Sequence, residues 1–145
     1  MDYNAINTLV SKAHYKDDRM IVGHLNRDTV GITVDGYVMW FIPEKDFLFD
    51  ITKLVENETD LKRLITTDGY VNAVLTNTLT ATEKRTLVTF KAGDIECFVD
   101  KKLLKTFDPK LSTYKIKNAV SGVLVYEGEK LVGTVLPVKY NKNNL

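Results

Sequence analysis

The sequence predicts an α+β protein in which an amphipathic helix followed by a three-stranded antiparallel meander occurs twice. Three observations lead to this prediction: a helical period near the N-terminus, an Asp-Gly turn between two apolar runs, and a similarity between the two ends of the chain. The chain has 145 residues, of which 44% are hydrophobic and 27% charged. This composition is typical of a folded domain with a hydrophobic core. We therefore expect a single domain over residues 1–145.

The first repeat, residues 2–45, begins with a predicted amphipathic helix at 4–15. Asp2 or Asn4 suits its N-cap, because either side chain accepts a backbone N–H at a helix start. Apolar side chains recur at the i, i+3, i+4 and i+7 positions, namely Ile6, Leu9, Val10 and Ala13.

A meander with three strands, at 20–25, 29–34 and 37–42, follows this helix. The second and third strands flank Asp35-Gly36, a pair that tolerates the positive φ of a tight hairpin turn. The third strand, YVMWFI, is apolar on both faces. We expect it to be central and covered on both sides, and the alternative is an exposed patch around Trp40 that binds a partner.

The connecting region, residues 46–84, carries weaker signals. The segments 50–55 and 60–65 each begin with Asp and fit short helical turns. Residues 70–80 are rich in β-branched side chains and predict a strand. The polar sequence NTLTATEK at 77–84 instead suggests an exposed loop, so the end of this strand stays open.

The second repeat, residues 85–140, begins with a hairpin and continues with a short helix and a meander. The sequence DKKLL predicts a helix of about two turns, at 101–107, that ends before Asp108-Pro109. The hairpin strands are expected at 85–90 and 94–99, and the meander strands at 112–117, 121–128 and 130–140.

The repeat itself is visible when residues 29–45 are aligned with residues 120–139. The aligned segments are Ile32-Thr33-Val34 with Leu124-Val125-Tyr126, Asp35-Gly36 with Glu127-Gly128, and Phe41-Ile42-Pro43 with Val135-Leu136-Pro137. Two unrelated apolar hairpins also resemble each other over such a length, so duplication and coincidence both remain open.

This (αβββ)₂ plan resembles that of DNA sliding-clamp domains, which build processivity rings around duplex DNA. CFVDKKLLKTF (97–107) is similar to the element that joins a strand to the second helix of a bacterial clamp domain, and GTVLPVKY (133–140) is similar to its closing strand. The resemblance covers about half of the chain. It implies a DNA-clamp-like fold and a non-catalytic accessory role in DNA metabolism, and the size and composition suit a phage or mobile element.

The resemblance also implies nucleic-acid-binding residues. The helices of a clamp meet the phosphate backbone of duplex DNA, and lysines here recur at helical spacing on both predicted helices. These lysines are Lys12 and Lys16 on the first helix, and Lys101, Lys102 and Lys105 on the second. The alternative is that they are ordinary solvated charges.

Asp100 and Lys102 form a D-x-K sequence at the end of a predicted strand, which raises the hypothesis of a metal-dependent nuclease. Asp94, the nearest second carboxylate along that strand, lies six residues away, and a strand rises by about 3.3 Å per residue. The two carboxylates are therefore too far apart to share a metal ion. We favour Asp100 as the N-cap of the following helix.

We expect no catalytic residue, no cofactor and no metal site. His14 and His24 lack the spacing of metal ligands, and Cys97 alternates with core residues of its strand. The single cysteine favours a reducing compartment. Residues 1–18 lack the apolar run of a signal peptide, and no stretch has the roughly 20 apolar residues that span a bilayer. We expect a cytoplasmic protein with no membrane partner.

A second functional hypothesis is a protein-interaction module or inhibitor that does not bind DNA. Such a protein would use an open sheet edge or the surface near Trp40. Self-association through strand edges is a further expectation.

Overall fold

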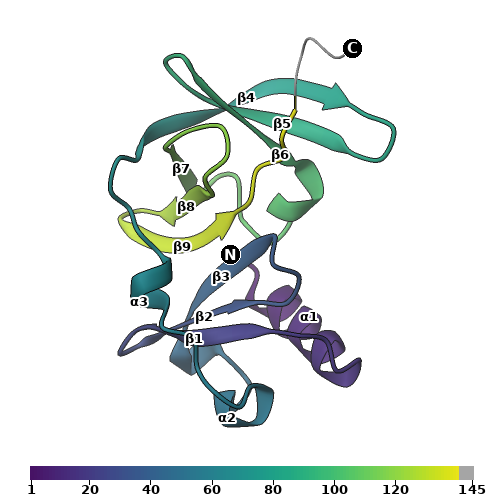
Figure 1. Ribbon diagram of the computed structural model, residues 1–145, viewed down its shortest axis with the longest axis vertical. Helices are drawn as coiled ribbons and strands as arrows, with labels where there is room; N and C mark the ends of the chain where they lie inside the picture. The colour runs from purple at the N-terminus through teal and green to yellow at the C-terminus, as the bar shows by residue number, and fades with distance from the viewer. Residues whose placement is uncertain (141–145) are drawn as a thin grey trace.

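The computed structural model describes residues 1–140 and has an α+β fold, as the sequence predicts. Nine strands form one antiparallel sheet in the order β1-β2-β3-β9-β8-β7-β4-β5-β6 (Figure 1). Residues 141–145 of the predicted domain lie outside the described residues. The strands are β1 (Ile21–Asn26), β2 (Thr29–Thr33), β3 (Val38–Pro43), β4 (Val71–Ala81), β5 (Thr86–Ala92), β6 (Ile95–Asp100), β7 (Ser112–Ile116), β8 (Val123–Glu127) and β9 (Lys130–Val135). The helices are α1 (Tyr3–Tyr15), α2 (Ile51–Leu54) and α3 (Leu61–Leu64), with the 3₁₀ helices η1 (Glu44–Asp46) and η2 (Lys101–Leu104).

Both predicted meanders are confirmed, as β1–β2–β3 and β7–β8–β9. Their last strands, β3 and β9, pair antiparallel, with Trp40 opposite Gly133. The hairpin connection between β2 and β3 lies at the predicted Asp-Gly pair, but it spans residues 34–37 and has a positive φ at Gly36 (81°) and not at Asp35, so it is longer than the tight turn expected. The N-terminal and C-terminal meanders are therefore parts of one continuous sheet.

The helix α1 covers one face of the β1–β3 meander. Its N-cap is Asp2, whose carboxylate accepts the Ala5 N–H at 3.0 Å. Ile6 and Val10 are completely buried among side chains of the meander. Leu9, predicted on the same stripe, is 39% exposed and lies outside the core.

The opposite face of this meander is covered by α3, which confirms that β3 is buried on both sides. Gly23 and Gly31 face each other on β1 and β2, and their missing side chains leave room for Leu61 of α3. A Cβ atom on Gly31 would lie 2.4 Å from Leu61 Cδ1. Trp40 packs on the α1 side and Phe41 on the Leu61 side. The predicted short helices at 50–55 and 60–65 are confirmed as α2 and α3.

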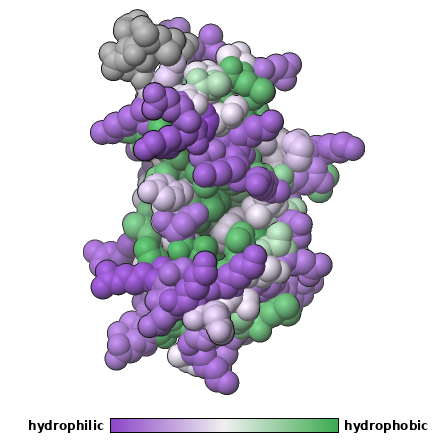
Figure 2. All heavy atoms as spheres, turned by 90° about the vertical axis from the view of Figure 1, so that its right-hand side faces the viewer, coloured by the Kyte–Doolittle hydropathy of each residue, from purple (hydrophilic) through white to green (hydrophobic). Residues whose placement is uncertain are grey.

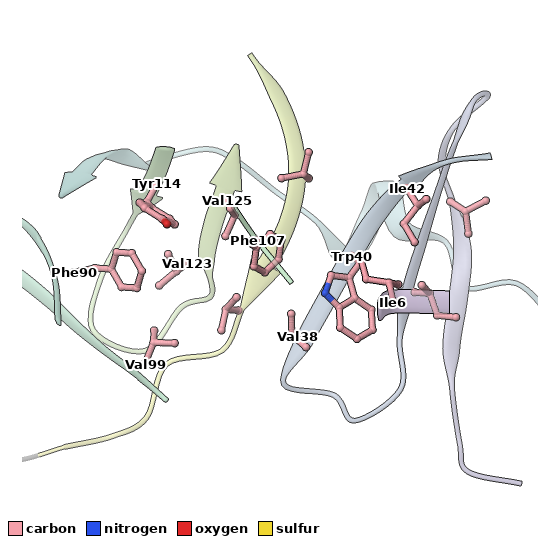
Figure 3. Close-up of a cluster of buried hydrophobic side chains, with 14 of the residues drawn as sticks. Ile6, Val38, Trp40, Ile42, Phe90, Val99, Phe107, Tyr114, Val123 and Val125 are labelled. Atoms are coloured by element: carbon pink, nitrogen blue, oxygen red, sulfur yellow. The ribbon is translucent and has the colours of Figure 1, made fainter. Parts of the chain in front are cut away.

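In the other half of the molecule the sheet bends along β4. Residues 71–73 pair with β7, whereas residues 74–81 pair with β5. The bend brings β6 back toward the segment after β9, where the Val138 N–H donates to the Phe98 carbonyl at 2.7 Å. Figure 3 shows that Phe107 lies between the side chains around Trp40 and those around Phe90.

Two predictions about local structure were wrong: the helix at 101–107, and the strand at 130–140, which ends at Val135 as β9. The helix expected at 101–107 is the single 3₁₀ turn η2, because the side chains of Thr106 and Phe107 are buried and the chain must turn into the core after Leu104. The strand predicted at 70–80 is confirmed as β4, and of the two alternatives left open for residues 77–84 the strand holds up to Ala81, with the loop beginning at residue 82. Pairing with β5 holds the polar end of β4 in the sheet, where Ala81 lies opposite Thr86.

Candidate functional site

Five cationic side chains gather beside η2, at two adjoining pockets of about 560 and 650 Å³. We call the two pockets together the basic groove. The side chains that line both pockets are Lys84, Arg85, Asp100 and Lys102. Lys101 and Lys105 line the first pocket, and Asp35 and Tyr37 line the second.

The pairing of β5 with β6 brings these cations together. Leu87 lies opposite Asp100 in this antiparallel pair, so the residues just before Leu87 and just after Asp100 meet at the same edge. Arg85 ends the β4–β5 turn and Lys102 lies in η2. Figure 1 shows this turn and η2 on the same side of the molecule.

The first pocket has an apolar lining beneath its charged rim. Phe107, which is 4% exposed, packs against the backbone of Gly133 in β9, where a Cβ atom would lie 2.5 Å from the ring. Figure 2 shows this side of the molecule, with apolar side chains in a hollow between hydrophilic ones. The remaining apolar lining consists of Leu75, Val88, Leu104, Pro109 and Tyr114.

The groove carries an excess of positive charge that the whole chain does not. Five cations and two carboxylates line it, which leaves three net positive charges, against a net charge of +1 for the chain. The two carboxylates also accept backbone N–H groups. Asp100 Oδ1 accepts from Lys102 at 3.2 Å, and Asp35 Oδ1 accepts from Tyr37 at 2.8 Å. The net positive electrostatic potential at the groove therefore attracts anions.

The structure brings together three of the five lysines that the sequence singled out. Lys101, Lys102 and Lys105 are exposed and line the groove. Lys12 and Lys16 are exposed but line neither pocket. They lie at the C-terminal end of α1. The N-terminal end of α1 is the end near η2, because the N–H of its N-cap, Asp2, donates to the carbonyl of Thr106, two residues after η2, at 2.8 Å. At 1.5 Å per residue, Lys12 is about 15 Å further along the helix axis.

Sequence reasoning missed Lys84, Arg85 and Tyr37. The adjacent pair Lys84-Arg85 was visible as a local charge, but nothing near it in the sequence shows that it lies over η2. The position of Lys84 and Arg85 depends on where β4 ends, and the polar residues 77–84 gave no clear signal for that end.

The capping role favoured for Asp100 is confirmed. Its carboxylate accepts the Lys102 N–H and lies 3.8 Å from Lys102 Nζ. Asp94 lies beyond the opposite end of β6, as the strand geometry requires. Within residues 1–140, no group of three or more His, Cys, Asp or Glu side chains is placed to hold a metal ion.

Cys97 and the histidines lie apart from the groove residues. Cys97 is fully buried, and its thiol donates to the Asn118 carbonyl at 2.8 Å. Burial raises the pKa of this thiol to about 11, so it is almost entirely protonated at neutral pH. His14 is exposed on α1, and His24 lies between two glutamates. The core position predicted for Cys97 is confirmed.

Comparison of the chain with protein-family models, with curated proteins and with solved structures gives no match. In the described part of the chain, no helix is both long enough and apolar enough to pass through a bilayer.

Proposed function

We propose that this protein is a non-catalytic accessory protein of DNA metabolism, which binds the phosphate backbone of DNA through the basic groove. The observation that supports this most directly is the cluster of five exposed cations around η2 and the β4–β5 turn. Lysine and arginine side chains bind phosphates without reading bases, so such a cluster suits binding that does not depend on sequence. The thiol of Cys97 is buried and forms no disulfide, which suits a protein that works in the reducing cytoplasm.

A sliding-clamp-like form is the finer version of this proposal. The strand order β1-β2-β3-β9-β8-β7 is the order that two equivalent meanders produce when they join through their last strands. In a clamp-like protein η2 would stand in the place of the second helix, and the protein would assemble with further copies or other subunits. Lys12 and Lys16 of α1 would then contact the duplex together with the lysines of η2.

Binding to duplex DNA of arbitrary sequence, measured at several salt concentrations, tests the proposal. Phosphate contacts release counterions, and the logarithm of the affinity falls with the logarithm of the salt concentration by about 0.9 per phosphate contacted. We expect a slope between about −3 and −4.5 for three to five contacts. The combined variant Lys101→Glu, Lys102→Glu and Lys105→Glu should lose most of the affinity. An affinity that does not depend on salt, or on these lysines, would refute backbone binding.

The double variant Lys12→Glu and Lys16→Glu separates the groove from the clamp-like form. If the groove alone binds DNA, these changes on α1 affect the affinity much less than the changes on η2. If the clamp-like form is correct, both variants weaken binding to a similar degree. Light scattering with and without DNA then shows whether a ring-sized assembly forms.

A second candidate is a protein-interaction module or inhibitor. The apolar lining of the first pocket favours it, since a phosphate backbone alone does not use such a lining. In that case an acidic segment of a partner protein would place an apolar side chain in the pocket. Binding of a leucine-containing acidic peptide, lost in the η2 lysine variant, with no binding to DNA, would support this candidate over the first.

A further inference from the structure

We propose that the basic groove takes a single strand of nucleic acid, whose unstacked bases lie against the apolar lining while its phosphates meet the rim. This proposal rests on the proposed nucleic-acid binding and specifies the kind of strand. It arises from the combination of charge, apolar surface and an exposed aromatic ring in one groove.

The apolar lining distinguishes a single strand from a duplex. In a duplex the base faces are stacked on one another, and the surface that meets a protein groove is mainly phosphate and sugar. A single strand presents the base faces themselves, which are flat and largely apolar. Leu75 and Leu104, both half-buried, provide aliphatic surface for such a face in the same pocket as Lys101, Lys102 and Lys105.

Tyr37 is an exposed aromatic residue among those that line the second pocket. It is 60% exposed and lines this pocket together with Arg85 and Lys102. Its backbone is fixed on both sides, because its N–H donates to Asp35 at 2.8 Å and its carbonyl accepts the Leu136 N–H at 2.8 Å. An aromatic side chain on a rigid turn beside cations is the usual composition of a site where bases stack and phosphates are neutralised.

An acidic peptide is the main competing occupant, and the exposed ring argues against it. A peptide anchor would account for the apolar first pocket and the cations. It would give no role to Tyr37, which lines the second pocket together with Arg85 and Lys102. A single strand uses the whole groove, since its bases and phosphates alternate along its length.

The experiment compares three fluorescent probes of equal length, about 12 nucleotides, by anisotropy: a thymidine strand, the corresponding duplex, and an abasic strand with the same phosphates. We expect the thymidine strand to bind at least tenfold more tightly than the duplex or the abasic strand. Tyr37→Ala should weaken binding of the thymidine strand roughly five- to tenfold and leave binding of the abasic strand unchanged. Tyr15→Ala is the matched control, because Tyr15 is 93% exposed on α1 and lines neither pocket.

The outcomes separate this inference from the proposed function. Equal binding of the thymidine and abasic strands, or tighter binding of the duplex, would overturn the single-strand inference while backbone binding stands. If Tyr15→Ala also loses binding of the thymidine strand, the effect of Tyr37→Ala is not specific to the groove, and the groove is not the binding site. Absence of binding to all three probes would overturn both, and binding of a leucine-containing acidic peptide would then assign the groove to a protein partner.

Discussion

Trp40 donates its indole N–H to the hydroxyl of Thr106 at 2.8 Å, and both side chains are buried. Trp40 belongs to β3 in the first meander, and Thr106 follows η2, 66 positions further along the chain. Phe107, the next residue, lines the basic groove. The bond therefore links the core of the α1 half of the molecule to the segment that shapes the candidate site.

Replacing Thr106 by valine tests this link. Valine has nearly the same shape but no acceptor, so the Trp40 N–H would remain buried without a partner. Such a group typically costs about 1–3 kcal/mol. We expect Thr106→Val to lower the free energy of unfolding by this amount in urea denaturation. Thr113→Val is the control, because Thr113 is exposed on β7 and should change stability by less than about 0.5 kcal/mol. Equal stability of the two variants would contradict the role of the bond.

Gly133 is required by the ring of Phe107. A Cβ atom at this position would lie 2.5 Å from Phe107 Cζ and 3.0 Å from the Met39 carbonyl oxygen. We expect Gly133→Ala to cost about 1–3 kcal/mol of stability through overpacking. In the double variant with Phe107→Leu, the smaller side chain relieves part of the clash, so the two effects should not add. Additive losses in chemical denaturation would show that the ring does not enforce the glycine.

His24 makes stability depend on pH. Its ring contacts Glu44 at 3.1 Å and Glu58 at 2.6 Å, and these hydrogen bonds raise the pKa of His24 above its usual 6.5. A raised pKa in the folded state means that the stabilisation is fully present below pH 6.5 and is lost as pH rises through the folded pKa. NMR titration of the His24 ring should give a midpoint above 6.5. Glu44→Gln should lower that midpoint, and an unchanged midpoint would exclude the pairing with Glu44.

Cys97 should resist thiol reagents in the folded protein. Burial raises the pKa of this thiol to about 11, and the side chain has no exposed surface. Only the thiolate reacts, so both its low population and its burial slow the reaction. We expect no colour change with Ellman's reagent at pH 8 until denaturant is added, and then the release of one thiol per chain. Rapid labelling of the native protein would contradict the buried position.

The elements predicted from the sequence are those whose signal is local. The β2–β3 hairpin follows from Asp35-Gly36, and α1 follows from its apolar period and the cap at Asp2. The pairing of Trp40 in β3 with Gly133 in β9 was not predicted, because nothing near either residue specifies a partner more than ninety positions away. Tertiary pairing also extended β4 beyond its apolar part, where Leu79 is 56% exposed.

The same distinction applies to the candidate site. Lys101, Lys102 and Lys105 were found because they cluster within five residues. Lys84 and Arg85 join them only through the register of β5 against β6, and the length of β4 decides where their turn lies. A charge pattern in the sequence is therefore enough to predict a basic segment. To predict the groove, one must also know how strands that are distant in sequence pair.

Asp100→Asn distinguishes a capping residue from a catalytic one. Asparagine keeps an oxygen that accepts the Lys102 N–H, so η2 should remain capped and the urea midpoint should remain unchanged. The change removes one of the two carboxylates that line the basic groove, Asp100 and Asp35, so binding of a polyanion should strengthen. Asp100 is only 8% exposed, but Lys102 Nζ, 3.8 Å from its carboxylate, is exposed and would be free to meet a phosphate. We therefore expect the affinity for the thymidine strand to rise at low salt and the gain to shrink as salt is added. A catalytic Asp100 predicts the opposite pattern, in which the protein cleaves DNA with Mg²⁺ or Mn²⁺ and the variant loses that cleavage.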